Sequence, residues 1–127
     1  KRDVPMNEMK FEVYPKGIYS VIKQFSKYDI DNIIITENGV CYKDSVEEGR
    51  IHDQERTAFF ESYLAQVLKA KKEGAPVTGY FVWSLTDNFE WSEGYEPRFG
   101  LIHVDFNTQK RTLKDSGYWF QKFLNQD

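Results

Sequence analysis

The sequence is poor in the residues that most often build disulfide frameworks and metal sites. Of its 127 residues, one is a cysteine, Cys41, and two are histidines, His52 and His103. A single cysteine excludes an internal disulfide framework and any metal site with several cysteine ligands. Two separated histidines are too few for a typical zinc motif. We therefore expect no metal site and no cofactor.

Long apolar runs and an excess of basic residues are missing as well. No apolar run approaches the roughly 18 residues that a membrane-spanning helix needs, so we expect no membrane partner. The formal net charge is -3 and no basic stripe is visible, which argues against nucleic acid as a partner. One free cysteine and the lack of an Asn-X-Ser/Thr glycosylation sequence lead us to expect a cytoplasmic protein.

The length allows one modest domain, and we expect no internal boundary within residues 1–127. The chain begins at Lys1 and not at a methionine, which hints at a piece of a longer protein. Aromatic residues make up 17% of the chain. This content suits flat ligands such as carbohydrates, and it equally suits a large buried core.

Helical and strand patterns alternate along the first two thirds of the chain. Apolar residues at helical spacing predict a helix over residues 15–28 and a second helix that Asp53 caps and Gly74 ends. Short apolar stretches at residues 33–37 and 77–84 predict two strands. This order implies parallel strands joined by a crossover. The second stretch is apolar on both faces, so we expect it to be covered on both sides.

The helices are expected to bury aromatic stripes, and the last third adds a strand and a helix. On the second helix the stripes are Phe59, Tyr63 and Val67, and Phe60, Leu64 and Leu68. Residues 92–98 read as a loop, and residues 99–106 alternate loosely as a short strand does. Residues 115–124 predict a helix with four aromatic side chains packed inward: Tyr118, Trp119, Phe120 and Phe123.

Both predicted strands end in polar and aromatic residues. The first ends in Thr-Glu-Asn-Gly at residues 36–39, which delivers Glu37 to the strand tip. The second runs into Trp-Ser-Leu-Thr-Asp-Asn-Phe-Glu-Trp at residues 83–91. Parallel strands end at one edge, where α/β enzymes build their sites. A capping or ion-paired role for Glu37 and a core role for Trp83 are the alternatives.

These motifs together resemble glycoside hydrolase family 1, the β-glucosidase family. Besides the two motifs, Gly-Tyr at residues 94–95 and Arg-Phe-Gly-Leu at residues 98–101 fit the family pattern in the right order. The resemblance implies an α/β fold, the (β/α)8 TIM barrel. This chain would be its C-terminal part, about strands 7–8 with the flanking helices.

The resemblance also implies roles for five residues. Glu37 would be the catalytic nucleophile of a retaining glycosidase. Trp83 would stack on the sugar ring, and the carboxylate of Glu90 would accept hydrogen bonds from two sugar hydroxyls. Trp91 would donate its indole N–H to a neighbouring hydroxyl, and Phe99 would line the same pocket.

The expected substrate is a non-phosphorylated β-glycoside, glucoside first. The 6-phosphoglycoside branch of the family is similar but carries Ser at the position of Glu90, and Lys and Tyr at those of Pro97 and Phe99. Phosphate needs donors and positive charge, which the residues of this chain do not offer there. Glucose, galactose and fucose remain open, since Glu90 could accept either arrangement of hydroxyls at C4.

The main departure from the family pattern is the acid/base glutamate. The family carries it in a Thr-X-Asn-Glu-Pro motif, which this chain lacks, since Asn-Glu-Met at residues 7–9 has no proline. We therefore expect the isolated chain to be inactive and to need the remainder of the barrel, in the same or another chain. Two alternatives stay open: a non-catalytic carbohydrate- or receptor-binding relative, and a thioglucosidase with glutamine at the acid/base position.

Overall fold

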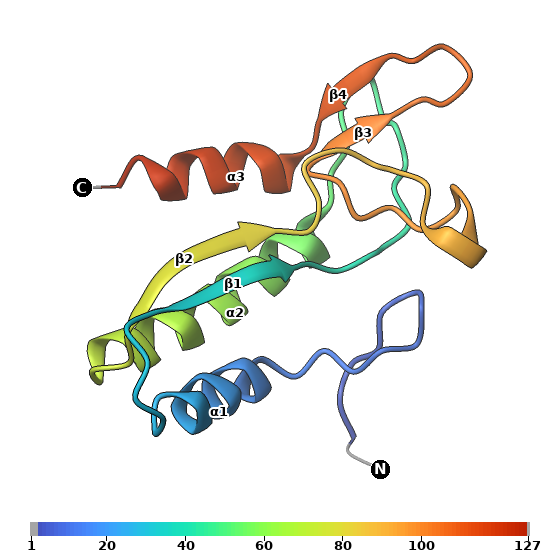
Figure 1. Ribbon diagram of the computed structural model, residues 1–127. Helices are drawn as coiled ribbons and strands as arrows, with labels where there is room; N and C mark the ends of the chain where they lie inside the picture. Colours follow the sequence, from blue (N-terminus) through green and yellow to red (C-terminus); the bar gives the residue numbers. More distant parts are fainter. Residues whose placement is uncertain (1–2, 127) are drawn as a thin grey trace.

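The computed structural model describes residues 3–126, which form three helices, two strand pairs and one short 3-10 helix (Figure 1). In chain order the elements are α1 (Pro15–Phe25), β1 (Ile33–Asn38), α2 (Gln54–Lys72), β2 (Val77–Val82), η1 (Trp91–Glu93), β3 (Ile102–Val104), β4 (Arg111–Leu113) and α3 (Asp115–Leu124). The predicted alternation of helix and strand in the first part of the chain is confirmed.

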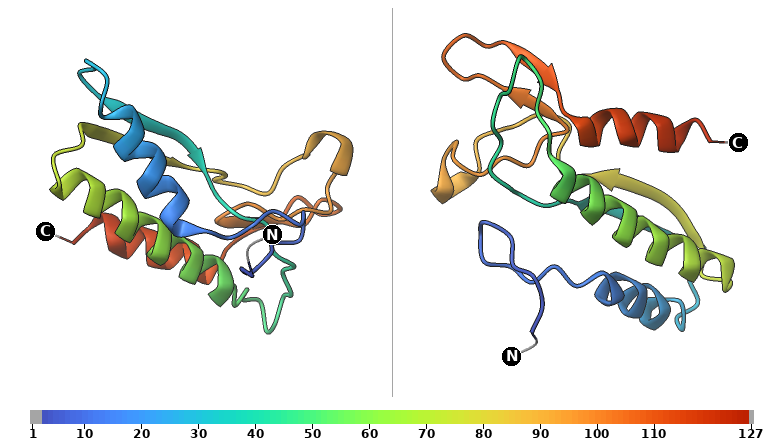
Figure 2. Two further views of the ribbon diagram at one scale, coloured as in Figure 1. Left: turned by 90° about the horizontal axis from the view of Figure 1, so that it is seen from below. Right: turned by 180° about the vertical axis from the view of Figure 1, so that it is seen from behind.

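Strands β1 and β2 pair in parallel, as predicted, with α2 as the connection between them. Helices α1 and α2 cover one face of this pair (Figure 2). Ile22 of α1 and Val67 of α2 form a buried cluster against which Ile33 and Ile35 of β1 pack. The alternation of residues along β1 thus follows from burial of every second side chain.

A second core joins α2 to α3. Its buried residues are Val40, Phe59, Phe60, Tyr63, Leu64 and Leu101, and three aromatic residues of α3 pack against them: Trp119, Phe120 and Phe123. The aromatic residues of both predicted stripes on α2 are therefore core, as expected. Two predicted core residues are not buried, because Leu68 and Tyr118 lie on the outer faces of their helices with 49% and 54% of their surfaces exposed.

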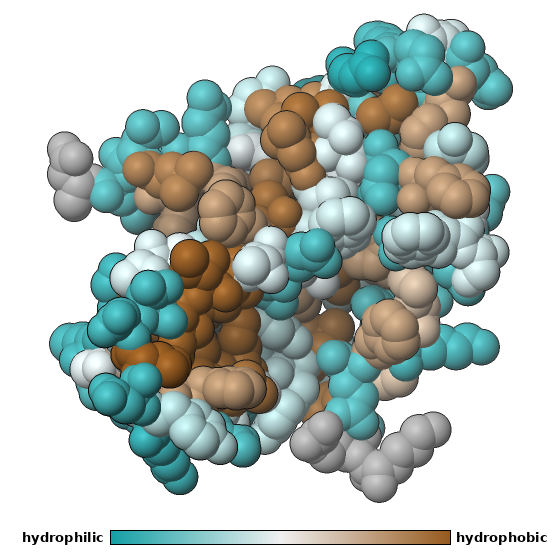
Figure 3. Space-filling view, in the orientation of Figure 1, coloured by the Kyte–Doolittle hydropathy of each residue, from teal (hydrophilic) through white to brown (hydrophobic). Residues whose placement is uncertain are grey.

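The face of the strand pair that lies opposite the helices is open. Ile34 of β1 is 49% exposed and Phe81 of β2 is 61% exposed. Apolar side chains gather over these strands in the space-filling view (Figure 3). The expectation that β2 is covered on both faces is wrong for the described residues, which supply only one covering layer.

Several predicted boundaries also change. Helix α1 ends at Phe25, three residues early, where the Ser26 hydroxyl donates to the Ile22 carbonyl. The strand expected over residues 99–106 is only Ile102–Val104, which forms an antiparallel hairpin with the unpredicted β4. Asp53 precedes α2 as expected but makes no side-chain capping bond, because its carboxylate binds Arg56 and Ser116 instead.

Candidate active site at the tips of the parallel strands

The backbone of β1 carries an irregularity just where Glu37 occurs. Ile35 pairs with Tyr80 and Asn38 with Val82, so three steps along β1 match two steps along β2. Such an extra residue is a β-bulge, which re-aims the side chains that follow it. Ile33 and Ile35 turn toward the helices, whereas Thr36 and Glu37 are both exposed. The bulge therefore turns Glu37 away from the helix layer.

Trp83 follows β2 directly and lies beside the end of β1. Its backbone N–H donates to the Asn38 carbonyl over 2.9 Å. The approach is close, because a Cβ atom on Gly39 would lie 1.5 Å from the Trp83 carbonyl oxygen. Only glycine fits there. The backbone thus holds Glu37 and Trp83 at the same edge of the sheet.

Glu90 and Trp91 lie further along the same loop, around η1 (Figure 1). The Glu90 N–H donates to the Gly94 carbonyl over 2.6 Å and closes this turn. One carboxylate oxygen of Glu90, Oε2, is buried without a hydrogen-bond partner among the described residues. Trp91 is 81% exposed.

Phe99 is buried beside the start of this loop. Only 8% of its surface is exposed, so it reaches solvent far less than Trp91 does. Its carbonyl accepts the Ser84 N–H over 3.3 Å, and the Leu101 N–H donates to the Ser84 carbonyl over 3.0 Å. These bonds fix the segment after β2 against residues 99–101.

A buried network of charges, which the sequence did not reveal, lies beneath both loops. It contains three acidic side chains and three basic ones: Asp44, Asp53, Asp87, Arg56, Arg98 and Lys114. Burial is the main cause that lowers the pKa of Lys114, whereas Asp44 and Asp87 raise it. One sequence signal was available, since Arg56 precedes Phe59 and Phe60 by one helical turn on the apolar face of α2.

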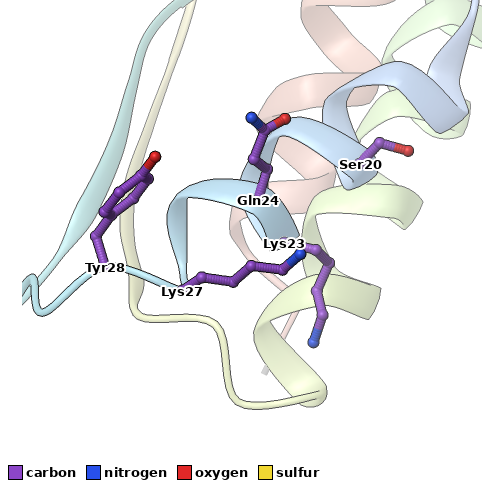
Figure 4. A pocket seen from close by; sticks show the side chains of 5 residues that line it. All are labelled: Ser20, Lys23, Gln24, Lys27 and Tyr28. Atoms are coloured by element: carbon purple, nitrogen blue, oxygen red, sulfur yellow. The ribbon is translucent and has the colours of Figure 1, made fainter.

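Two pockets show how the site relates to the rest of the surface. A pocket of about 270 Å³ lies between the loop after β1 and the loop around η1, with Tyr42, Lys43 and Arg98 in its wall. A larger one, about 520 Å³, lies at the end of α1 and the turn before β1, where Lys23, Lys27 and their neighbours line it (Figure 4). The larger pocket is therefore at the end of β1 remote from Glu37.

Other kinds of site are not supported by the described residues. Residues 3–126 hold no group of three or more His, Cys, Asp or Glu side chains that could bind a metal ion. Within the same range no helix has the length and apolar character needed to cross a membrane. Cys41 is buried, and burial raises the pKa of its thiol, which makes it a poor nucleophile.

Comparison with known proteins places this arrangement in a family. The sequence model of "Glycosyl hydrolase family 1" matches residues 1–127. Beta-glucosidase A of Thermotoga maritima is 47% identical over 129 residues, covering 100% of this chain and 29% of that protein. The 6-phospho-beta-galactosidase of Clostridium acetobutylicum is 43% identical over 122 residues, with 94% of this chain and 26% of that protein covered.

A solved structure gives the same result in three dimensions. The family 1 β-glucosidase from Thermotoga maritima in complex with isofagomine lactam superposes with a TM-score of 0.95 at 48% identity. The match covers 98% of this chain and 29% of that chain, so the present chain spans under a third of its relatives' length. By sequence and by structure, the chain belongs to glycosyl hydrolase family 1, a family of α/β-barrel glycosidases.

Proposed function

We propose that this chain is the C-terminal part of a retaining β-glycosidase that acts on non-phosphorylated β-glycosides, glucosides first. It supplies the nucleophile Glu37 and the sugar-binding residues Trp83, Glu90, Trp91 and Phe99. The observation that carries the proposal is the tip of β1, where the bulge exposes Glu37 and the backbone bond from Trp83 to Asn38 holds Trp83 at the same edge of the sheet.

The chemistry proceeds in two displacements. A carboxylate oxygen of Glu37 attacks the anomeric carbon while the bond from that carbon to the aglycone oxygen breaks. A carboxylic acid from the remainder of the barrel gives its proton to the departing oxygen. Water then attacks the glycosyl ester, the same residue takes the proton of that water as a base, and Glu37 leaves as carboxylate.

The preference against phosphate rests on the charges around the loop. Glu90 brings a negative charge with one buried, unpaired oxygen, which would repel a sugar phosphate. The Arg98 guanidinium, a cation next to Phe99 in sequence, is held by Asp87 over 3.2 Å and by the Val104 carbonyl over 2.8 Å. Phe99 offers no donor. These features favour neutral sugar hydroxyls over a phosphate group.

The remainder of the barrel is the partner that this proposal requires. The chain lacks the Asn-Glu-Pro motif of the acid/base residue. Its open strand face exposes Ile34 and Phe81, and further strands that close the sheet into a barrel would enclose that face in the interior. We expect no useful turnover from the 127 residues alone, because a missing general acid costs about 10²–10⁴-fold in rate.

A trapping experiment tests the proposal. The complete protein that contains this segment is incubated with an activated 2-deoxy-2-fluoro-β-glucoside, whose glycosyl ester hydrolyses slowly. We expect one covalent adduct on the peptide that contains Glu37, found by mass spectrometry, and none in the Glu37→Gln variant. An adduct on another residue, or none together with no turnover of aryl β-glucosides, would overturn the proposed function.

The same sample separates the alternatives. A thioglucosidase would form the Glu37 adduct but would hydrolyse unactivated O-glucosides poorly, whereas a β-glucosidase hydrolyses both aryl and alkyl glucosides. A binding relative would take up a glucoside without forming an adduct or releasing an aglycone.

A further inference from the structure

The buried charge network lies between the two loops that carry the proposed site. Asp87 belongs to the loop after β2, four residues after Trp83 and three before Glu90. Its side chain is 0% exposed. Among the six charged residues, it is the one that lies within residues 83–91, the segment we call the sugar-binding loop.

Asp87 binds four donors with its two carboxylate oxygens. Oδ1 accepts the Gly100 N–H and the Lys114 ammonium, both over 2.9 Å. Oδ2 accepts the Val104 N–H and the Arg98 guanidinium, both over 3.2 Å. This one carboxylate therefore fixes the loop after β2 to the segment that follows Phe99.

Lys114 carries the connection to the other loop. Its side chain is 0% exposed, and its ammonium forms ion pairs with both Asp87 and Asp44. Asp44 lies in the loop that continues from Glu37, and it also pairs with Arg56 over 3.1 Å. One buried cation thus joins the loop after the proposed nucleophile to the loop with the sugar-binding residues.

The charges in this network balance, three negative against three positive. Removing one member leaves a buried charge without compensation, whereas removing two opposite charges together keeps the balance. A buried ion pair adds little stability compared with well-packed apolar residues, so stability alone does not account for the network. It does impose a single relative position on two segments far apart in the sequence.

We propose that Lys114 and Asp87 are positioning residues, which set the sugar-binding loop relative to Glu37 without touching the substrate. The inference rests on the proposed function, since it names what holds that same site in place. A displacement of about 1 Å in such a site can cost about a hundredfold in rate. Loss of either residue should therefore weaken recognition of the sugar hydroxyls as well as the rate.

The test uses the complete enzyme and four variants: Asp87→Asn, Lys114→Met, the double variant D87N/K114M, and Asp115→Asn as control. Asp115 is adjacent to Lys114 and also forms ion pairs, but with the exposed Arg50 and His52. Each variant is assayed well below its melting temperature. The readout is kcat/KM for an aryl glucoside and for the aryl xyloside, which has the same leaving group and lacks the hydroxymethyl group.

We expect Asp87→Asn and Lys114→Met to lower kcat/KM for the glucoside by about a hundredfold and to shrink the glucoside-to-xyloside ratio by at least tenfold. The double variant should have a higher melting temperature than the single variants, but its glucoside-to-xyloside ratio should stay low. The control Asp115→Asn should change neither the rate nor this ratio. A merely structural role would move the melting temperature and leave the ratio unchanged, and that result would overturn the inference.

The remaining outcomes separate a failure of the positioning role from a failure of the proposed function. If neither Asp87→Asn nor the balanced double variant folds, the network belongs to folding and the positioning role is wrong. If the unmodified enzyme hydrolyses no β-glycoside, the proposed function itself fails. A fully active enzyme whose variants keep the ratio contradicts only the role of Lys114 and Asp87.

Discussion

The Tyr80 hydroxyl donates a hydrogen bond of 2.7 Å to the side-chain oxygen of Asn38, the residue that follows Glu37. Burial raises the pKa of Tyr80, so the phenol stays protonated and remains a donor. The Asn38 carbonyl in turn accepts the Trp83 N–H. Asn38 thus connects the middle of β2, the tip of β1 and Trp83, the first residue of the proposed sugar-binding loop.

Replacing Tyr80 by Phe removes this donor and leaves the Asn38 oxygen without its partner. We expect the free energy of unfolding to fall by about 0.5–1.5 kcal/mol and kcat to fall as the strand tip loosens. Tyr63→Phe is the matched control, because its hydroxyl accepts the Tyr14 N–H over 3.0 Å, away from Asn38. Chemical denaturation and steady-state kinetics on both variants of the complete protein check this, and equal kcat losses would contradict it.

A methyl group at Gly39 should separate the two strand tips. The added carbon would lie 1.5 Å from the Trp83 carbonyl oxygen, and a backbone atom cannot move aside cheaply. We expect Gly39→Ala to lower kcat/KM at least a hundredfold in the complete enzyme.

Gly49→Ala serves as the comparison for Gly39. A carbon there meets nothing within 4 Å, but the φ of +79° is unfavourable for alanine. It should cost about 1–2 kcal/mol of stability and leave the activity unchanged. Thermal melts alongside the kinetics separate the two effects, and an active Gly39→Ala enzyme would refute the close approach.

Glu90 should control the choice between neutral and phosphorylated sugars. If Glu90 binds two sugar hydroxyls, as proposed above, Glu90→Ser removes two charge-assisted hydrogen bonds, each worth about 1.5–3 kcal/mol. We expect kcat/KM for an aryl β-glucoside to fall at least a hundredfold, while the relative activity on the 6-phosphoglucoside rises. Parallel assays on the two substrates measure this, and an unchanged ratio would show that Glu90 does not select against phosphate.

Asp115 should contribute stability that depends on pH. The hydrogen bond with His52 and the pairing with Arg50 hold its pKa below the ordinary 3.8. A lowered folded-state pKa gives stability that is present above about pH 4 and lost as the pH falls through the folded value. The stability gap between wild type and Asp115→Asn should therefore narrow from about pH 5 to about pH 2.

Urea denaturation across that pH range provides the measurement. Glu61→Gln, an exposed position on α2, controls for the general effect of removing a negative charge. A gap between wild type and Asp115→Asn that stays constant with pH would rule out this role of Asp115.

The local elements followed from the sequence because their signals are local. Asp115 and Leu124 bound α3 as predicted, and the apolar spacing from Phe59 onward marks the buried face of α2. Glu37 at the end of β1 was also predictable, from a β-branched run that stops at a carboxylate. The assigned roles of the five site residues stay predictions until they are tested in the complete protein.

The features that could not be predicted from the sequence depend on contacts between residues far apart in the chain. Strand β4 has three residues and acquires its structure only by pairing with β3. Asp53 carries the signal of a cap, but Arg56 and Ser116 take its carboxylate, and Ser116 is 63 residues away. The bulge before Asn38 is likewise a property of the pairing with β2. The order of residues within β1 alone does not predict it.

The bulge also makes the placement of the residues at the tip of β1 depend on the length of the strand and not on its composition. The exposure of Glu37 comes from one additional backbone residue between Ile35 and Asn38, not from the kinds of side chains beside it. Exchanges among β-branched residues in β1 should therefore be tolerated. A single-residue deletion there would shift Asn38 and Gly39 by one position relative to Trp83, so an insertion–deletion scan should find this short segment intolerant where a substitution scan finds it permissive.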